Sequence, residues 1–242
     1  MPDDPGLDRA RRDAQALHVR VQQEAALALA AECTAERDPA RLAPRLAQAA
    51  ATVADAYTAA SPVRAQHACK KGCSFCCYQP VRLTPAEAIT IAAVLRANLP
   101  AEWLARLQTV LEQRTRGLAG LGVADYRKAR IPCPFLDGTG ACGIHPVRPL
   151  ACRGVASVDL PGCQTHYVDP EKPQPRLDQL VFVTTNAVQE ALRSTCRERG
   201  RDATVYELHA AVGRALATAD AAARWAAGED VFADCLTLDA QQ

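Results

Sequence analysis

The feature that most constrains this chain is the placement of its cysteines. Four of the 11 cysteines fall within the nine residues Cys69–Cys77, and two of these four are adjacent. Four more lie between residues 130 and 175, where proline and glycine are frequent and regular structure must be short. These are Cys133, Cys142, Cys152 and Cys163. Cysteines are therefore concentrated where side-chain packing is least able to order the backbone, and the fold needs another source of order there.

A framework of disulfides does not suit this sequence. The N-terminal residues hold no apolar stretch typical of a secretion signal, and no apolar run approaches the roughly 18 residues of a membrane helix. We therefore expect a soluble, cytoplasmic protein with reduced thiols and no membrane contact. An odd number of cysteines, 11, also argues against complete pairing. Adjacent Cys76 and Cys77 could pair only in a strained ring.

The rest of the chain is typical of helices. Hydrophobic residues make up 49% of the sequence but aromatic residues only 5%, which favours closely packed helices over a sheet sandwich. Thr84, Pro85 and Glu87 form the pattern of a capping box, which predicts a helix over 85–97. The other predicted helices are 6–36, one from near Pro44 to residue 61, one from Pro100 to the glycines at 117–122, 176–199 and 203–227.

These elements predict one mainly α domain over residues 1–242. Residues 1–62 form an N-terminal helical hairpin, 63–175 a metal-binding core rich in Cys, Pro and Gly, and 176–242 the C-terminal helices and tail. The core holds at most one short β-hairpin, with its turn at Asp137-Gly138. The formal net charge is only +1, so no strong positive field points to nucleic acid or an acidic membrane.

Metal ligation suits the pattern of the eight clustered cysteines better than redox pairing. Gly72 allows a sharp bend before Cys73, and adjacent Cys76 and Cys77 point in different directions, so they more easily serve different centres. A thioredoxin-like interpretation of Cys73-Ser-Phe-Cys76 lacks its strand and helix. Cys33, Cys196 and Cys235, outside the two segments, are predicted to be small buried hydrophobes.

The choice of metal stays open at this point. Structural zinc sites usually use two Cys-x2-4-Cys turns, and the second segment has none, so an iron–sulfur cluster fits at least as well. Radical SAM enzymes share the spacing of Cys69, Cys73 and Cys76, but the strand–helix series of their barrel is absent. Nearby basic residues, including Arg148 and Arg153, could offset the charge of the thiolates. His145 and His166 are expected to be solvent-facing or hydrogen-bonded rather than ligands.

The sequence resembles a known family. "CKKGCSFCC", "PCPFLDGTGACGIHPVRPLACR" and the spacing to Cys163 resemble YkgJ-like cysteine-cluster proteins, also described as a zinc- or iron-chelating CxxCxxCC domain, over about residues 66–166. The cysteine pattern is also similar to that of flagellin lysine N-methylases, which are associated with an iron–sulfur cluster. This chain has three residues, not two, between Cys69 and Cys73, and His145 stands where many members have tyrosine.

The resemblance implies both a ligand set and accompanying residues. The implied ligands are Cys69, Cys73, Cys76, Cys77, Cys133, Cys142, Cys152 and Cys163. Arg148 and Arg153 are the implied accompanying motif positions, which we assign to cofactor binding.

Three functions follow as hypotheses. The first is a protein that holds an iron–sulfur cluster, with [4Fe–4S] expected, or Fe or Zn ions, and folds only when loaded. The second is a cluster-dependent oxidoreductase or protein-modifying, methylase-like enzyme, with a protein substrate and with Asp137, His145, Arg148, Arg153 and His166 as polar candidates. The third is a structural zinc module that binds a protein partner.

Overall fold

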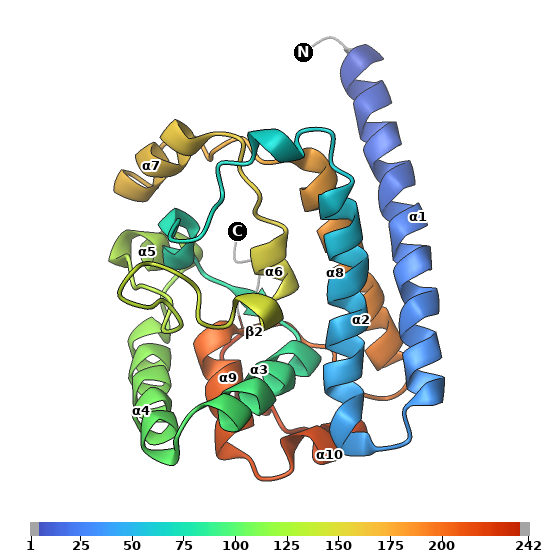
Figure 1. Cartoon of the computed structure of the whole chain (residues 1–242), viewed down its shortest axis with the longest axis vertical. Helices are drawn as coiled ribbons and strands as arrows, with labels where there is room; N and C mark the ends of the chain where they lie inside the picture. The colour runs from blue at the N-terminus through green and yellow to red at the C-terminus, as the bar shows by residue number, and fades with distance from the viewer. Residues whose placement is uncertain (1–4, 238–242) are drawn as a thin grey trace.

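The computed structural model describes residues 5–237, and this part of the chain is mainly helical. Helices α1 (Pro5–Ala35), α2 (Pro39–Ala59) and α8 (Gln179–Arg197) pack against one another. The first turns of α1 extend past the neighbouring helices (Figure 1). Helix α8, from the C-terminal part of the chain, thus forms one three-helix layer with α1 and α2.

The second helix begins earlier than the sequence predicted. The expected start near Pro44 was wrong, since α2 begins at Pro39 and Pro44 lies inside it. The side chain of Asp38 accepts a hydrogen bond from the Ala40 N–H at 2.9 Å and so caps the first turn. A side-chain cap, rather than the second proline, decides where this helix starts.

The helices after the first cysteine segment follow the prediction more closely. Helix α3 (Pro85–Asn98) carries the capping box, and α4 (Ala101–Leu118) ends among the glycines. A short helix, α5 (Val123–Ala129), follows.

The single helix expected over 203–227 was wrong. It is divided into α9 (Leu208–Ala217) and α10 (Ala221–Ala226). The Glu207 carboxylate caps α9 by accepting from the Ala210 N–H, and Asp220 adopts a positive φ of 51° that separates the two helices.

The named strands of the described residues form one antiparallel pair. Strand β1 (Arg82–Leu83) pairs with β2 (Tyr206–Glu207), with Arg82 opposite Glu207 and Leu83 opposite Tyr206. The hairpin expected around Asp137-Gly138 is a turn closed by one isolated bridge between Leu136 and Cys142. Three hydrogen bonds to one oxygen of Asp137, two from Thr139 and one from Ala141, hold that turn without a strand ladder.

The cysteine-rich region contains only short elements. They are η1 (Arg64–Gln66), η2 (Phe75–Tyr78), η3 (His145–Val147), α6 (Leu150–Arg153) and α7 (Leu160–Val168). Helix α6 packs against α8 and α2, whereas α7 lies farther out and contacts η2 (Figure 1). No helix in residues 5–237 has the length and apolarity needed to cross a membrane.

Candidate metal centre

The backbones of the two cysteine segments lie side by side. The Cys133 N–H donates to the Cys77 carbonyl at 2.8 Å, and the Ala68 N–H donates to the Ser157 carbonyl at 2.8 Å. Gly72 and Gly140 approach so closely that a Cβ on Gly140 would lie 3.0 Å from the Gly72 oxygen. Backbone contacts beside the cysteines therefore hold the two cysteine segments together, although they are distant in sequence.

The first set of neighbouring thiols is Cys69, Cys73 and Cys163. Cys69 is exposed, and its sulfur accepts a hydrogen bond from the Ser157 N–H at 3.3 Å. Burial raises the pKa of Cys163, the Ser157 side chain opposes this through a hydrogen bond, and nearby Cys69 and Cys73 raise the pKa further. Burial likewise raises the pKa of Cys69. As free thiols, Cys69 and Cys163 therefore favour the protonated form.

A second set consists of Cys133, Cys142 and Cys152, all half-buried. Burial, with a smaller contribution from Cys142, raises the pKa of Cys133 to about 11. The pKa of Cys152 is raised still more strongly, by burial first and then by the nearby thiols of Cys133, Cys76 and Cys142. Burial also raises the pKa of Cys142. Closely spaced buried thiols of this kind lose their protons when a cation takes the place of those protons.

Cys76 and Cys77 connect the two sets through η2. A hydrogen bond between these two thiols raises the pKa of Cys76, and desolvation adds to the effect. Cys76 is exposed and Cys77 half-buried. The thiol of Cys76 lies near enough to Cys69, Cys163, Cys142 and Cys152 to raise the pKa of each.

Arg148 is the cation that acts on four of these thiols, while the charge of Arg114 lowers the pKa of Cys133. The charge of Arg148 lowers the pKa of thiols in both sets, in opposition to burial, and these are Cys69, Cys76, Cys142 and Cys152. One guanidinium nitrogen, Nη1, lies 2.6 Å from His145 Nε2. The Nε of Arg148 is buried and has no hydrogen-bond partner among the described residues. Arg148 thus brings positive charge and an unsatisfied donor to the thiols.

His145 is exposed and lies beside this arginine. Burial of part of the ring and the charges of Arg148 and Arg153 lower the pKa of His145, so its neutral form is favoured. A neutral Nε2 can accept the hydrogen bond from Arg148. His166 is buried, and its Nδ1 lies 3.0 Å from the Lys172 carbonyl, which agrees with the expected hydrogen-bonded role.

Arg153 clamps the loop that carries Arg148. Its Nη1 contacts both oxygens of Asp55 on α2, at 2.8 and 2.6 Å. Its Nη2 donates to the Pro146 carbonyl and its Nε to the Arg148 carbonyl, at 2.7 and 3.1 Å. All three guanidinium nitrogens therefore have protein partners, and direct cofactor binding by Arg153 stays a prediction.

A buried glutamate anchors the second segment to helix α3. Glu87 is 5% exposed, and its carboxylate accepts hydrogen bonds from the N–H and hydroxyl of Thr84 and from the Leu150 N–H. The Leu150 bond is 2.7 Å long and spans 63 residues of sequence. The sequence revealed the capping box but gave no signal for this third partner, which positions α6 and hence Cys152.

Another buried carboxylate, that of Asp178, ties three segments together. Its Oδ2 accepts from the Ser61 hydroxyl and lies 2.8 Å from His67 Nε2, while its Oδ1 caps α8. The Asp178 N–H donates to the Ala156 carbonyl at 2.8 Å. The end of α2, the chain entering the first cysteine segment and the start of α8 therefore meet at one side chain, which sequence reasoning missed.

Aromatic side chains lie beside η2. Tyr167 makes edge contacts with Phe75 and Tyr78, with ring centroids 5.7 and 4.9 Å apart, and Arg130 lies 5.6 Å from the centroid of the Tyr167 ring. No periodicity in the sequence indicated this cluster. It joins α7 to the loop that carries Cys76 and Cys77.

The remaining cysteines were predicted to be small buried hydrophobes, and this holds fully for Cys196 alone. Cys196 is buried in the hydrophobic core, and Cys33 and Cys235 pack against that core while half-buried. Within residues 5–237, no three His, Cys, Asp or Glu side chains are arranged so that they could hold one metal ion as they stand. The neighbouring thiols would have to turn toward a common point to bind one.

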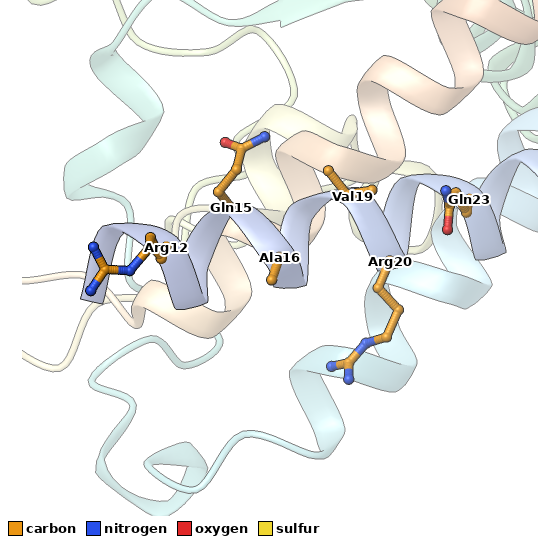
Figure 2. A pocket seen from close by; sticks show the side chains of 6 residues that line it. All are labelled: Arg12, Gln15, Ala16, Val19, Arg20 and Gln23. Carbon is orange, nitrogen blue, oxygen red and sulfur yellow. The ribbon is translucent and has the colours of Figure 1, made fainter. Parts of the chain in front are cut away.

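Two surface hollows among the described residues lie away from the cysteines. One is lined by a single face of α1, with Arg12, Ala16 and Val19 among its residues (Figure 2). A smaller one lies between α6 and α8 and is lined by residues such as Gly154 and Thr185. Neither of these two hollows is lined by a cysteine of the array.

The comparisons with known proteins agree with this placement. Residues 68–174 match the family model described as "CxxCxxCC: Putative zinc- or iron-chelating domain", and the matched range includes all eight clustered cysteines. The resemblance found in the sequence is thereby confirmed for this part of the chain. No curated protein and no solved structure matches the chain.

Proposed function

We propose that this chain, whose residues 68–174 form a CxxCxxCC domain, binds an iron–sulfur cluster or iron or zinc ions through its eight clustered cysteines. The observation that supports this most is the meeting of the two cysteine segments around Arg148. Sulfur-only ligand sets favour zinc and iron–sulfur clusters over hard cations such as magnesium or calcium. The proposed ligands are Cys69, Cys73, Cys76, Cys77, Cys133, Cys142, Cys152 and Cys163.

The charges of the site suit such a group. Four thiolates around a divalent ion, or around a cluster, leave net negative charge. Arg148 would offset that charge, and its buried, unpartnered Nε could donate a hydrogen bond to sulfur. Arg153 holds the backbone of this loop in place. We infer that Arg148 acts on the metal group directly and that Arg153 acts through Arg148.

An iron–sulfur cluster would supply electron transfer at this site, whereas zinc would supply structural order. The lack of a second Cys-x2-4-Cys turn in residues 130–175 supports the cluster, with [4Fe–4S] as the expected type. A cytoplasmic location and a protein partner stay predictions from the sequence.

The test is metal and sulfide analysis, with a visible absorption spectrum, on protein purified without oxygen. We expect iron and sulfide in stoichiometric amounts, and their loss in Cys133→Ser/Cys152→Ser but not in the control Cys33→Ser/Cys235→Ser. Stoichiometric zinc without iron or sulfide would instead support a structural zinc module. A wild-type chain that binds neither iron nor zinc, even after anaerobic reconstitution, would refute the proposal.

A further inference from the structure

Glu207 is a completely buried carboxylate that does not belong to the cysteine array. It is the last residue of β2, is 0% exposed, and its Oε2 accepts the Ala210 N–H at 3.0 Å as the cap of α9. Such a cap does not require burial, since a carboxylate at the protein surface can accept the same N–H. Burial of a carboxylate is costly unless hydrogen bonds satisfy both of its oxygens, so the partners of the second oxygen matter.

The second oxygen of Glu207 binds a helix that leads into the second cysteine segment. Tyr126 on α5 is 2% exposed, and its hydroxyl donates to Glu207 Oε1 at 3.3 Å, while His209 Nδ1 lies 2.5 Å from the same oxygen. Burial raises the pKa of Tyr126 and the charge of Glu207 raises it further, so the hydroxyl keeps its proton and donates. Tyr126 and Glu207 are 81 residues apart in sequence, so their contact holds α5 against β2.

The backbone beside Glu207 holds the chain that leaves the first cysteine segment. Glu207 lies opposite Arg82 in the β1–β2 pair, and the Leu208 N–H donates to the Val81 carbonyl at 3.1 Å. Val81 follows Cys77 by four residues. One residue of the C-terminal part of the chain therefore contacts the end of one cysteine segment through its backbone and the approach to the other through its side chain.

These contacts close a ring that includes two of the cysteines. The Cys133 N–H donates to the Cys77 carbonyl at 2.8 Å and joins the two segments at one end, and Glu207 joins them at the other. Only three residues separate Cys77 from Val81, and six separate Tyr126 from Cys133. Because a residue spans at most about 3.6 Å, such short connections transmit a shift of α5 relative to β2 to the two cysteines.

We propose that Glu207 and Tyr126 are positioning residues of the metal centre, and that their hydrogen bond sets the place of Cys133 relative to Cys77. This inference rests on the proposed metal-binding function and assigns to it two residues that do not touch the metal. Glu207 also lies outside residues 68–174, the range that matches the family model. The C-terminal part of the chain thereby takes part in the site.

Two tyrosines provide a matched test. Tyr126→Phe removes only the hydroxyl that Glu207 accepts. The control Tyr206→Phe removes a hydroxyl that donates to the Asp202 carboxylate at 2.8 Å, from a side chain that is 6% exposed, but this bond joins residues four apart and no cysteine segment. Competition with a chelator measures the zinc dissociation constant of the reduced proteins. Tyr126→Phe should weaken zinc binding about 3- to 10-fold, and Tyr206→Phe should bind zinc as the wild type does.

Cobalt in place of zinc gives a second readout, which a loss of stability alone does not change. The visible bands of thiolate-bound cobalt depend on the arrangement of the ligands, so they should shift in Tyr126→Phe and not in Tyr206→Phe. Denaturant unfolding of the metal-free proteins shows whether the two variants lose similar stability. If the wild-type chain takes up only an iron–sulfur cluster, the rate of iron release to a chelator replaces both readouts, with the same order expected.

The outcomes separate the positioning role from metal binding itself. Unchanged affinity and unchanged cobalt bands in Tyr126→Phe would overturn the positioning role and leave metal binding intact. Equal weakening in both variants would also overturn it, because the effect would then follow from stability. A wild-type chain that binds no zinc, cobalt, iron or cluster would overturn the proposed function.

Discussion

The helical layer and the cysteine-rich region reach their order by different means. In the helices, side chains such as Leu46, Val188 and Leu192 are completely buried and belong to one continuous hydrophobic core. In residues 130–175, few large apolar side chains are buried, chiefly Phe135, Ile144 and Leu150. Burial of apolar area contributes roughly 25 cal/mol per Å², so it stabilises the first region far more than the second.

Buried polar groups at the edge of the cysteine region supply part of the stabilisation that apolar burial does not provide there. Glu87, Arg153 and Asp178 each fix backbone or side-chain groups on both sides of the boundary. All three are less than 9% exposed, where an unpaired charge would be costly. The helices thus provide a frame for the cysteine region, and under the proposed function we expect a bound metal to order the thiols between these anchors.

Removal of the metal should have the largest effect. It tests most directly whether packing orders the helices while metal orders the cysteine region. Structural zinc contributes about 10 kcal/mol or more to the folding of small zinc domains. Anaerobic chelation should therefore abolish hydrogen-exchange protection in the cysteine segments, while α1 and α8 keep theirs. Helicity lost from the whole chain would show that folding is coupled throughout. Unchanged exchange everywhere would show that the metal orders nothing.

Truncation of a side chain in the helical core should lower the stability of the fold and leave the metal content unchanged. Leu192→Ala removes a completely buried side chain and should lower the free energy of unfolding by about 2–5 kcal/mol. Phe182→Ala on the same helix is the control, since Phe182 is 41% exposed and should cost much less. Denaturant unfolding measures both. Metal content per chain should not change. If Leu192→Ala lost metal, the helical core and the cysteine region would not be independent.

Mutation of Glu87 should affect both regions. Glu87→Ala leaves the N–H groups of Thr84 and Leu150 without their acceptor and should cost roughly 2–3 kcal/mol. It should also speed the release of metal to a chelator. Glu87→Gln keeps one acceptor oxygen and should cost less in both assays. Equal metal release from all three proteins would show that α3 does not position Cys152.

The smallest effect concerns acid stability and Asp178. Burial alone would raise the pKa of Asp178, but hydrogen bonds from Ser61, His67 and the Val181 N–H together hold it below its ordinary value of 3.8. A lowered pKa stabilises the folded state above pH 3.8. This contribution disappears as the pH falls through the pKa that Asp178 has in the folded protein. Metal-free Asp178→Asn replaces hydrogen bonds to a charged acceptor by neutral ones, so it should lose about 1 kcal/mol at neutral pH and show a flatter acid limb in pH-dependent unfolding. An unchanged acid limb would contradict this.

Local patterns in the sequence were sufficient for some elements. The capping box at Thr84 and Glu87 predicted α3 correctly, because both partners lie within one turn. The start of α2 and the division of α9 from α10 depended on which side chain captured a backbone N–H. Periodicity does not report that choice, so Asp38 and Glu207 were missed as caps.

The site was predictable in composition but not in arrangement. The eight cysteines stood out by spacing, yet the contacts that place them, such as the Ser157 N–H on Cys69 and the turn at Asp137, did not. The contact between Asp178 and Ser61 spans 117 residues. Such long-range pairs leave no periodic trace in a single sequence. Arg148 and Arg153 were chosen together, but only the fold separates the arginine that faces the thiols from the one that clamps its loop.

Helix α7 couples the position of Cys163 to an aromatic contact. Cys163 and Tyr167 are four residues apart on this helix and so share one face. Through Tyr167, α7 makes edge contacts with the rings of Phe75 and Tyr78, and Tyr78 and Tyr167 also share a side-chain hydrogen bond, at the outer edge of the molecule. A displacement of α7 from η2 would carry the Cys163 thiol with it, so the place of this thiol depends on the packing of three aromatic rings.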